Sequence, residues 1–138
     1  MLKNKSVAVV VPAYNEEKQI VKVLESIPSF VDRIIVVNDC STDRTAECVR
    51  QFIESDRSER KIIQSKLKNE PVLTLYNKAE QVLHTKSKEE IKFFNPSEIA
   101  NENPETDRII LINHKVNGGV GGAIATGYKW CKDHDIDC

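Results

Sequence analysis

The sequence has no long apolar segment and almost no net charge, and these absences exclude several classes of protein. Lys and Arg together number 20 and Asp and Glu 21, so charge does not favour a nucleic-acid partner or a membrane surface. The sequence contains no span of about 20 apolar residues, which a membrane helix requires. The first apolar run meets Pro12 too early for a signal-peptide core of about 7 to 15 residues. We expect a soluble, cytoplasmic chain without membrane contact.

Cysteine and histidine are also scarce, and neither has the spacing of a metal site. The four cysteines form no C-x-x-C pair, which favours reduced thiols over a zinc site or a disulfide framework. The three histidines form no H-E-x-x-H motif, and no Ser/His/Asp set can be assembled. The alternating Asp133, Asp135 and Asp137 precede an expected strand, and Cys138 stands where a calcium loop needs Gly. We interpret this run as a solvated turn.

Two short Val and Ile runs, over residues 7–11 and 33–37, each stop at a polar cluster. The clusters are PAYNEE over residues 12–17 and NDCSTD over residues 38–43. Apolar runs without alternation suit strands buried on both faces of a parallel sheet. Ligands of such sheets bind just beyond the carboxyl ends of the strands. Both polar clusters are therefore expected to lie at one ligand-binding edge.

Helical periodicity follows each run, so strands and helices alternate in the manner of an α/β sandwich. A helix over residues 16–27, with Asn15 as its N-cap, is predicted from Ile20, Leu24 and Ile27 at i, i+4 and i+7. The next helix has an inward stripe of Ala46, Val49 and Ile53, and a third strand is expected over residues 109–113. The helix after it has a stripe of Val120, Ile124, Gly127 and Cys131.

The 138 residues suffice for one domain and are too few for two, so residues 1–138 are predicted to form a single domain. Residues 55–105 form an insertion much longer than an ordinary connection. Within it, residues 72–76 have strand propensity, residues 79–83 suggest a short helix, and residues 95–105 indicate a loop.

The polar clusters contain candidate ligand contacts, each with a structural alternative. The Asp39 carboxylate can accept hydrogen bonds from a base or ribose. Alternatively, it can be an acidic residue near a helix N-terminus, where the helix dipole stabilises negative charge. Glu16 has the same two interpretations. Tyr14 can stack on a nucleobase or belong to the core, and Asp43 and Ser41 are better candidates for caps.

The glycine-rich stretch over residues 117–127 follows a strand and opens a helix, where backbone N–H groups can meet a diphosphate. Counted from Gly119, the dinucleotide fingerprint has Ile124 in place of the third small residue, and no G-K-[ST] is present. Close packing on the sheet through Gly121, Gly122, Ala123 and Gly127 is an equally good interpretation.

Taken in order, VAVVVPAYNEEKQI, IIVVNDCSTDRTAE and NGGVGGAIATGYK resemble the nucleotide-binding half of family 2 glycosyltransferases, particularly the dolichyl- and polyprenyl-phosphate sugar synthases. The resemblance covers residues 5–54 and 107–133. It implies a Rossmann-like GT-A half, with a mostly parallel sheet flanked by helices. It also implies a UDP or GDP sugar donor and inverting transfer to a lipid-phosphate or saccharide acceptor. By the resemblance and the residues together, the nucleotide-binding candidates are Pro12, Ala13, Tyr14, Asn15, Glu16, Asn38, Asp39, Asp43, Asn117 and Gly119.

The chain departs from the family pattern at three points. Cys40 stands where the family commonly has Gly, and the insertion over residues 55–105 has no counterpart. The family also carries an Asp-x-Asp motif that binds Mg²⁺ or Mn²⁺ on the strand after the glycine-rich helix, and we expect this motif to be absent because the chain stops where that strand would begin. We therefore expect the metal in a full-length enzyme only, no catalytic residue in this chain, and a truncated, inactive fragment. The alternatives are a dinucleotide-dependent oxidoreductase domain and a non-enzymatic regulatory or assembly domain. Formation of a homo-oligomer stays open.

Overall fold

The computed structural model of the chain describes residues 2–66 and 96–138, with the side chains of residues 61–66 left undescribed. The elements in these two segments are β1 (Ala8–Ala13), α1 (Ile20–Ser26), β2 (Arg33–Asn38), α2 (Thr45–Lys66), β3 (Ser97–Ile99), β4 (Ile109–His114) and α4 (Gly119–Asp133). The strand expected over residues 72–76 and the helix over 79–83 lie outside the described residues.

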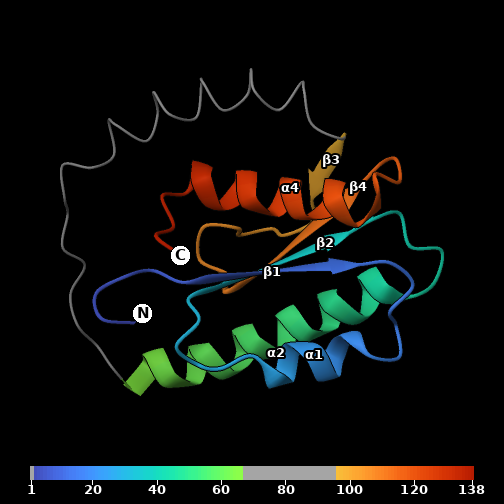
Figure 1. Ribbon diagram of the computed structural model, residues 1–138. Coiled ribbons are helices and arrows are strands. Elements are labelled where there is room, and N and C mark those ends of the chain that lie inside the picture. Colours follow the sequence, from blue (N-terminus) through green and yellow to red (C-terminus); the bar gives the residue numbers. More distant parts are fainter. Residues whose placement is uncertain (1, 67–95) are drawn as a thin grey trace.

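Four strands form one sheet in the order β1-β2-β4-β3. β1, β2 and β4 run parallel, and β3 pairs antiparallel with β4. Helices α1 and α2 cover one face of the sheet and α4 covers the other (Figure 1). The predicted mostly parallel α/β sandwich is therefore confirmed. In register, Ala13 pairs with Asn38 and Asn38 with Asn113, so the three parallel strands end together at one edge.

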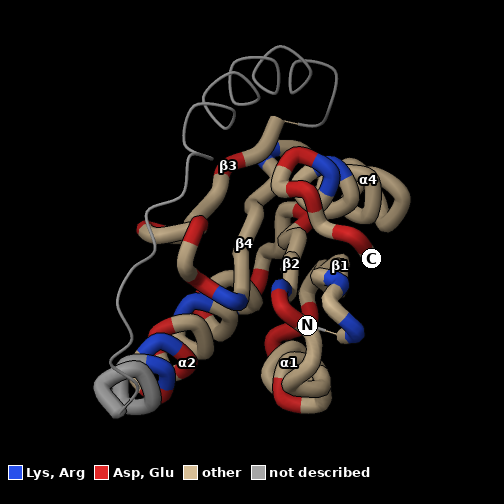
Figure 2. Tube along the Cα trace, turned by 90° about the vertical axis from the view of Figure 1, so that its left-hand side faces the viewer, with Lys and Arg blue, Asp and Glu red and all other residues tan. Residues whose placement is uncertain are grey.

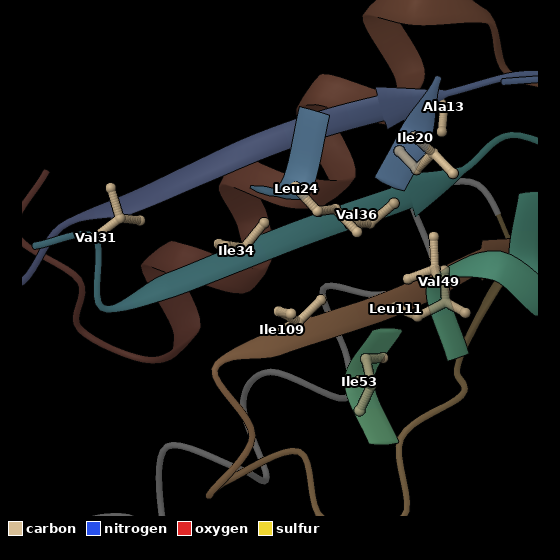
Figure 3. Close-up of a cluster of buried hydrophobic side chains, with 10 residues drawn as sticks. All are labelled: Ala13, Ile20, Leu24, Val31, Ile34, Val36, Val49, Ile53, Ile109 and Leu111. Atoms are coloured by element: carbon tan, nitrogen blue, oxygen red, sulfur yellow. The ribbon is translucent and has the colours of Figure 1, made fainter. Parts of the chain in front are cut away.

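The alternating sides of each strand supply two separate cores. Because successive side chains of a strand point to opposite faces, Ile34 and Val36 face α1 and α2 while Ile35 and Val37 face α4. Figure 3 shows the first core, which is formed by Ala13, Ile20, Leu24, Val31, Ile34, Val36, Val49, Ile53, Ile109 and Leu111. A strand buried on both faces cannot alternate in polarity, which explains the uninterrupted apolar runs.

Helix α4 lies on the sheet through a different stripe from the one predicted. Its buried residues are Ala123, Thr126, Gly127, Lys129 and Trp130. Of the predicted stripe only Gly127 is buried, and Val120 is exposed. The prediction followed apolar residues, whereas the surface that meets β1 requires small ones. The expected packing through small residues therefore holds at Ala123 and Gly127 but not at Gly121, whose missing side chain faces open space.

We expect Gly127→Ala to lower the free energy of unfolding by about 1–2 kcal/mol. The added Cβ would lie 2.3 Å from Val10 Cγ1, and overpacking of about 1–3 kcal/mol outweighs the helix propensity that Ala gains, about 1 kcal/mol. Urea unfolding measures the difference. Gly121→Ala is the matched control, because an added Cβ there has no neighbour within 4 Å and should stabilise the chain slightly. Equal effects of the two substitutions would contradict this account of the packing.

Three predicted boundaries are wrong. Helix α1 begins at Ile20 instead of residue 16, and its N-cap is Gln19 rather than Asn15. Helix α2 continues to Lys66, beyond the predicted start of the insertion at residue 55. Charged residues are frequent along this extension (Figure 2), and they include an Asp56–Arg60 pair at i, i+4. Residues 97–99 form β3 instead of a loop, because β4 offers them its open edge.

Candidate functional site

The loops after β1 and β2 are joined by hydrogen bonds at the carboxyl edge of the sheet. The Asn15 N–H donates to Ser41 Oγ (3.0 Å), and the Thr42 N–H donates to Asn15 Oδ1 (2.8 Å). Asn15 adopts a positive φ of 52°, a conformation that Asn tolerates better than most residues. Asn15 therefore fixes the two loops relative to each other instead of capping α1.

A second set of bonds joins the same loops one turn further along. The Glu17 N–H donates to Asp43 Oδ2 (3.2 Å), and the Arg44 N–H donates back to Glu17 Oε2 (3.1 Å). Asp43 Oδ1 also accepts the Thr45 N–H (3.0 Å) at the start of α2. Removal from water raises the pKa of Asp43, but the hydrogen bonds from Thr45 and Glu17 outweigh this and hold it below the ordinary value. Asp43 thus caps α2 and anchors the first loop.

Buried Asn38 joins the ends of β2 and β4. Its Nδ2 donates to Asn113 Oδ1 (2.9 Å), and its Oδ1 accepts the Ser41 N–H (3.1 Å). Both ends of the Asn38 amide are therefore engaged within the protein. A direct contact between Asn38 and a nucleotide stays a prediction.

Asp39 connects the end of β2 to the start of α4. Its Oδ1 accepts the Gly118 N–H (2.8 Å) and lies 2.8 Å from His114 Nδ1. Burial raises the pKa of the Asp39 carboxyl, but the bonds from Gly118, His114 and Gly119 outweigh it and lower the pKa below its ordinary range. The carboxylate is therefore held in its charged form at the edge where the three strands end.

The remaining predicted residues differ in their exposure to solvent, and therefore in whether they can contact a ligand. Tyr14 is 51% exposed and Glu16 is exposed, whereas Ala13 belongs to the core and its carbonyl accepts the Asp39 N–H. Pro12 is half-buried within β1. Tyr14 and Glu16 thus project from the same edge to which Asp39 is anchored.

Asn117 and Gly119 shape the turn that opens α4. Asn117 Oδ1 accepts the Gly119 N–H (3.0 Å), and Asn117 Nδ2 lies 3.4 Å from the Asp39 carbonyl oxygen. Gly119 has a φ of 72°, which a residue with a side chain adopts only at a cost. The positive φ therefore explains the glycine at position 119 without any contact to a ligand.

Cys40 keeps the loop conformation that glycine would adopt more easily. Its φ is 57°, and its thiol donates to the His114 carbonyl oxygen (3.0 Å). The departure from the family pattern thus leaves a residue with a side chain in the left-handed region, where non-glycine residues are strained.

We expect Cys40→Gly to raise the free energy of unfolding by about 0.5–1 kcal/mol, because Gly removes this strain. Thermal unfolding under reducing conditions measures the change. Cys48→Gly is the control, since Cys48 lies within α2, where Gly costs about 1 kcal/mol. Destabilisation by both variants would show that the Cys40 backbone carries no strain.

His114 and Thr126 were missed at the level of the sequence. His114 was one of three scattered histidines, yet the register places it directly beyond the Asn38–Asn113 pair, level with Asp39. A histidine that follows a buried strand and precedes a glycine-rich turn was the available signal. Thr126 lies on the buried side of α4, directly before Gly127 of the expected stripe.

A hollow of about 420 Å³ lies beside this edge, between the first loop and the start of α2. Its lining residues are Glu17, Lys18, Arg44, Glu47, Cys48 and Gln51. Neither Tyr14, Glu16 nor Asp39 lines it. The hollow is charged, and the Arg44–Glu47 ion pair spans part of it.

The carboxylates near the end of the chain serve local structure. Asp137 Oδ2 accepts from the Ser6 N–H and hydroxyl (both 2.9 Å), and these bonds lower the pKa of Asp137 to about 2. Asp133 pairs with Lys129 at i, i+4. Within residues 2–66 and 96–138, no group of three or more His, Cys, Asp or Glu side chains could hold a metal ion.

All four cysteines are free thiols. None of the helices in the described part of the chain combines the length and the apolar character that crossing a membrane requires.

Comparison with known proteins relates this geometry to a family. The chain is 41% identical over 59 residues to a dolichyl-phosphate beta-glucosyltransferase of Trichomonas vaginalis, with 35% of this chain and 18% of the relative covered. It is 40% identical over 50 residues to the poly(ribitol-phosphate) beta-N-acetylglucosaminyltransferase TarS of Staphylococcus aureus, with 33% and 9% covered. The alignments thus span less than a fifth of each relative.

No solved structure matches the chain. The sequence model of glycosyl transferase family 2 matches residues 8–70, which include both loops joined at the carboxyl edge. Over these residues the chain is similar to glycosyl transferase family 2.

Proposed function

We propose that this chain binds the nucleoside diphosphate part of a UDP or GDP sugar at the carboxyl edge of its sheet. The observation that carries the proposal is that the loops after β1 and β2 are joined at the edge where Asp39 lies. The Asp39 carboxylate stays ionised there, and Tyr14 and Glu16 are exposed at the same edge. An aromatic face and carboxylate acceptors suit a base and its ribose. The backbone N–H groups that open α4 suit a diphosphate.

The acceptor is proposed to be a lipid phosphate or a saccharide. The names of two relatives support this, since one acts on dolichyl phosphate and the other on poly(ribitol phosphate). Each alignment covers only a small part of the relative. Inverting transfer of the sugar to this acceptor is therefore also a proposal.

Mg²⁺ or Mn²⁺, which would stabilise the leaving diphosphate, does not fit the described residues. Where the structure is described, the chain gathers no carboxylate cluster, and Asp133 and Asp137 are engaged by Lys129 and Ser6. We therefore expect the chain alone to bind a donor without transferring its sugar. Sugar transfer by the chain alone, at a rate typical of an enzyme, would contradict this part of the proposal.

Thermal unfolding with a panel of nucleotides tests the donor proposal. A ligand at 100 times its dissociation constant stabilises the folded state by about 2.7 kcal/mol, so UDP or GDP should raise the melting temperature by several degrees. ADP controls for the diphosphate, and NAD and NADP for the oxidoreductase alternative. A shift with NAD or NADP alone would favour the oxidoreductase. No shift with any nucleotide would favour a non-enzymatic domain.

A further inference from the structure

The buried histidine at the end of β4 links the Asp39 carboxylate to helix α4. His114 is 4% exposed, and its ring nitrogens lie 2.8 Å from Asp39 Oδ1 and 2.7 Å from Thr126 Oγ1. Thr126 Oγ1 also lies 3.0 Å from the Gly122 carbonyl oxygen. A continuous set of hydrogen bonds therefore runs from β2 through β4 to the interior of α4.

The chemistry of the partners fixes the proton on the ring atom that faces Asp39. An ionised carboxylate only accepts hydrogen bonds, so His114 Nδ1 must carry a hydrogen and donate it. On the other side of the ring, the single Thr126 hydroxyl proton can reach either Gly122 O or His114 Nε2. Both arrangements leave the Nδ1–H bond to Asp39 intact. The hydrogen bond from His114 to the Asp39 carboxylate therefore does not depend on the orientation of the Thr126 hydroxyl.

Asp39 has little freedom to turn toward a ligand. Only 3% of the residue is exposed, and Oδ1 is held from two directions, by His114 and by the Gly118 N–H. A swing of the carboxylate toward solvent would break both bonds and leave the buried His114 donor unsatisfied. A nucleoside that uses Asp39 must therefore meet it in the orientation seen here.

We propose that His114 is a positioning residue of the nucleotide site: it fixes the Asp39 carboxylate in the orientation that recognises the nucleoside, and Thr126 fixes the His114 ring. This inference rests on the proposed function. His114 touches no ligand itself and acts through Asp39. The Gly118 N–H, which donates to the same carboxylate oxygen, ties the orientation of Asp39 to the start of α4, where the diphosphate is expected. The two halves of the ligand are thus recognised by parts of one hydrogen-bonded unit.

Two variants of nearly equal shape separate positioning from packing. In His114→Asn the amide nitrogen can take the place of Nδ1 and donate to Asp39, whereas His114→Leu has a similar outline and no donor. Loss of a hydrogen bond to a charged group predicts UDP or GDP binding weaker by on the order of tenfold or more in His114→Leu. His114→Asn should stay within about threefold of the wild type. A residue that only fills space would not be rescued by Asn.

The measurement is isothermal titration of the full chain with UDP and with GDP at low temperature, with circular dichroism confirming that each variant is folded. Thr126→Val, which keeps the shape and removes the hydroxyl, should weaken binding several-fold and decides the matter if His114→Leu does not fold. His134→Asn is the control, because His134 stacks on Trp130 at the far end of α4 and should bind as the wild type does.

The outcomes distinguish this inference from the function on which it rests. If the wild type binds neither UDP nor GDP, the proposed function fails and the inference fails with it. If the wild type binds and folded His114→Leu binds equally well, the inference is overturned while the proposed function stands. With His114→Leu unfolded, unchanged binding by Thr126→Val overturns the inference in the same way.

Discussion

Asp39→Ala is expected to weaken UDP or GDP binding by on the order of a hundredfold. The substitution removes the acceptor proposed for the nucleoside and releases His114 and the Gly118 N–H, which both bind its Oδ1. Hydrogen bonds to charged groups contribute about 1.5–3 kcal/mol each, so the loss of one or two gives an effect of this size. Titration calorimetry on folded protein measures it.

Asp32→Asn serves as the control for Asp39→Ala. Asp32 Oδ2 accepts the Val7 N–H (2.8 Å) at the opposite, amino end of the strands. Loss of the Asp32 charge should therefore change the stability of the chain but not its affinity for a nucleotide. Unchanged affinity in Asp39→Ala, or an equal loss in both variants, would contradict the location of the site.

Asp107→Ala is expected to lower the free energy of unfolding by about 2–3 kcal/mol. Arg57 Nε and Nη2 donate to the two Asp107 oxygens (2.7 and 2.5 Å), and Asn101 Nδ2 donates to Oδ2 (2.7 Å). The Asp107 side chain is 4% exposed and that of Arg57 is 26% exposed. Removing one partner of a buried pair leaves the other charge uncompensated, and the partial exposure of Arg57 limits the cost.

The same pair predicts how stability changes with pH. The hydrogen bond from Arg57 outweighs burial and holds the pKa of Asp107 below its ordinary value. Its stabilisation is therefore complete above the ordinary Asp pKa near 4 and is lost as the pH falls through the lowered pKa of the folded state. Asp107→Asn should flatten this part of the acid-unfolding curve.

Arg44→Ala is the comparison for Asp107→Ala, because the Arg44–Glu47 pair is exposed on both sides and should contribute little to stability. Urea unfolding at neutral pH measures both variants. If Asp107→Ala lowers the free energy of unfolding no more than Arg44→Ala does, the Arg57–Asp107 pair does not anchor the middle of α2 to the loop before β4.

The sheet could be predicted from the sequence because its central strands are buried on both faces. Uninterrupted Val and Ile runs at residues 33–37 and 109–113 have few other interpretations, and β2 and β4 lie where these runs predict. β3 could not be predicted, since three residues carry no periodicity and depend on the open edge of β4. The face of α4 was misjudged at Val120, Ile124 and Cys131, because the prediction followed apolar residues. The surface against β1 requires small ones, and the close approach of Gly127 to Val10 shows this only in the fold.

The meeting of the two polar clusters at one edge could also be predicted from the parallel sheet. Polar clusters after parallel strands must meet at one edge, and the loops after β1 and β2 do meet there. Their hydrogen bonds could not be anticipated, because Asn15 and Asp43 act across 27 and 26 positions of sequence. His114 had no local pattern, and its role depends on the register between β2 and β4.

Amide chemical-shift mapping of the full chain during titration with UDP and with GDP tests the central claim most directly. The account predicts that the shifts which saturate with at least one of the two nucleotides concentrate in residues 14–17, 38–43 and 114–119. Changes concentrated at the opposite edge, around residues 30–33 and 105–108, or no saturable change with either nucleotide, would contradict it.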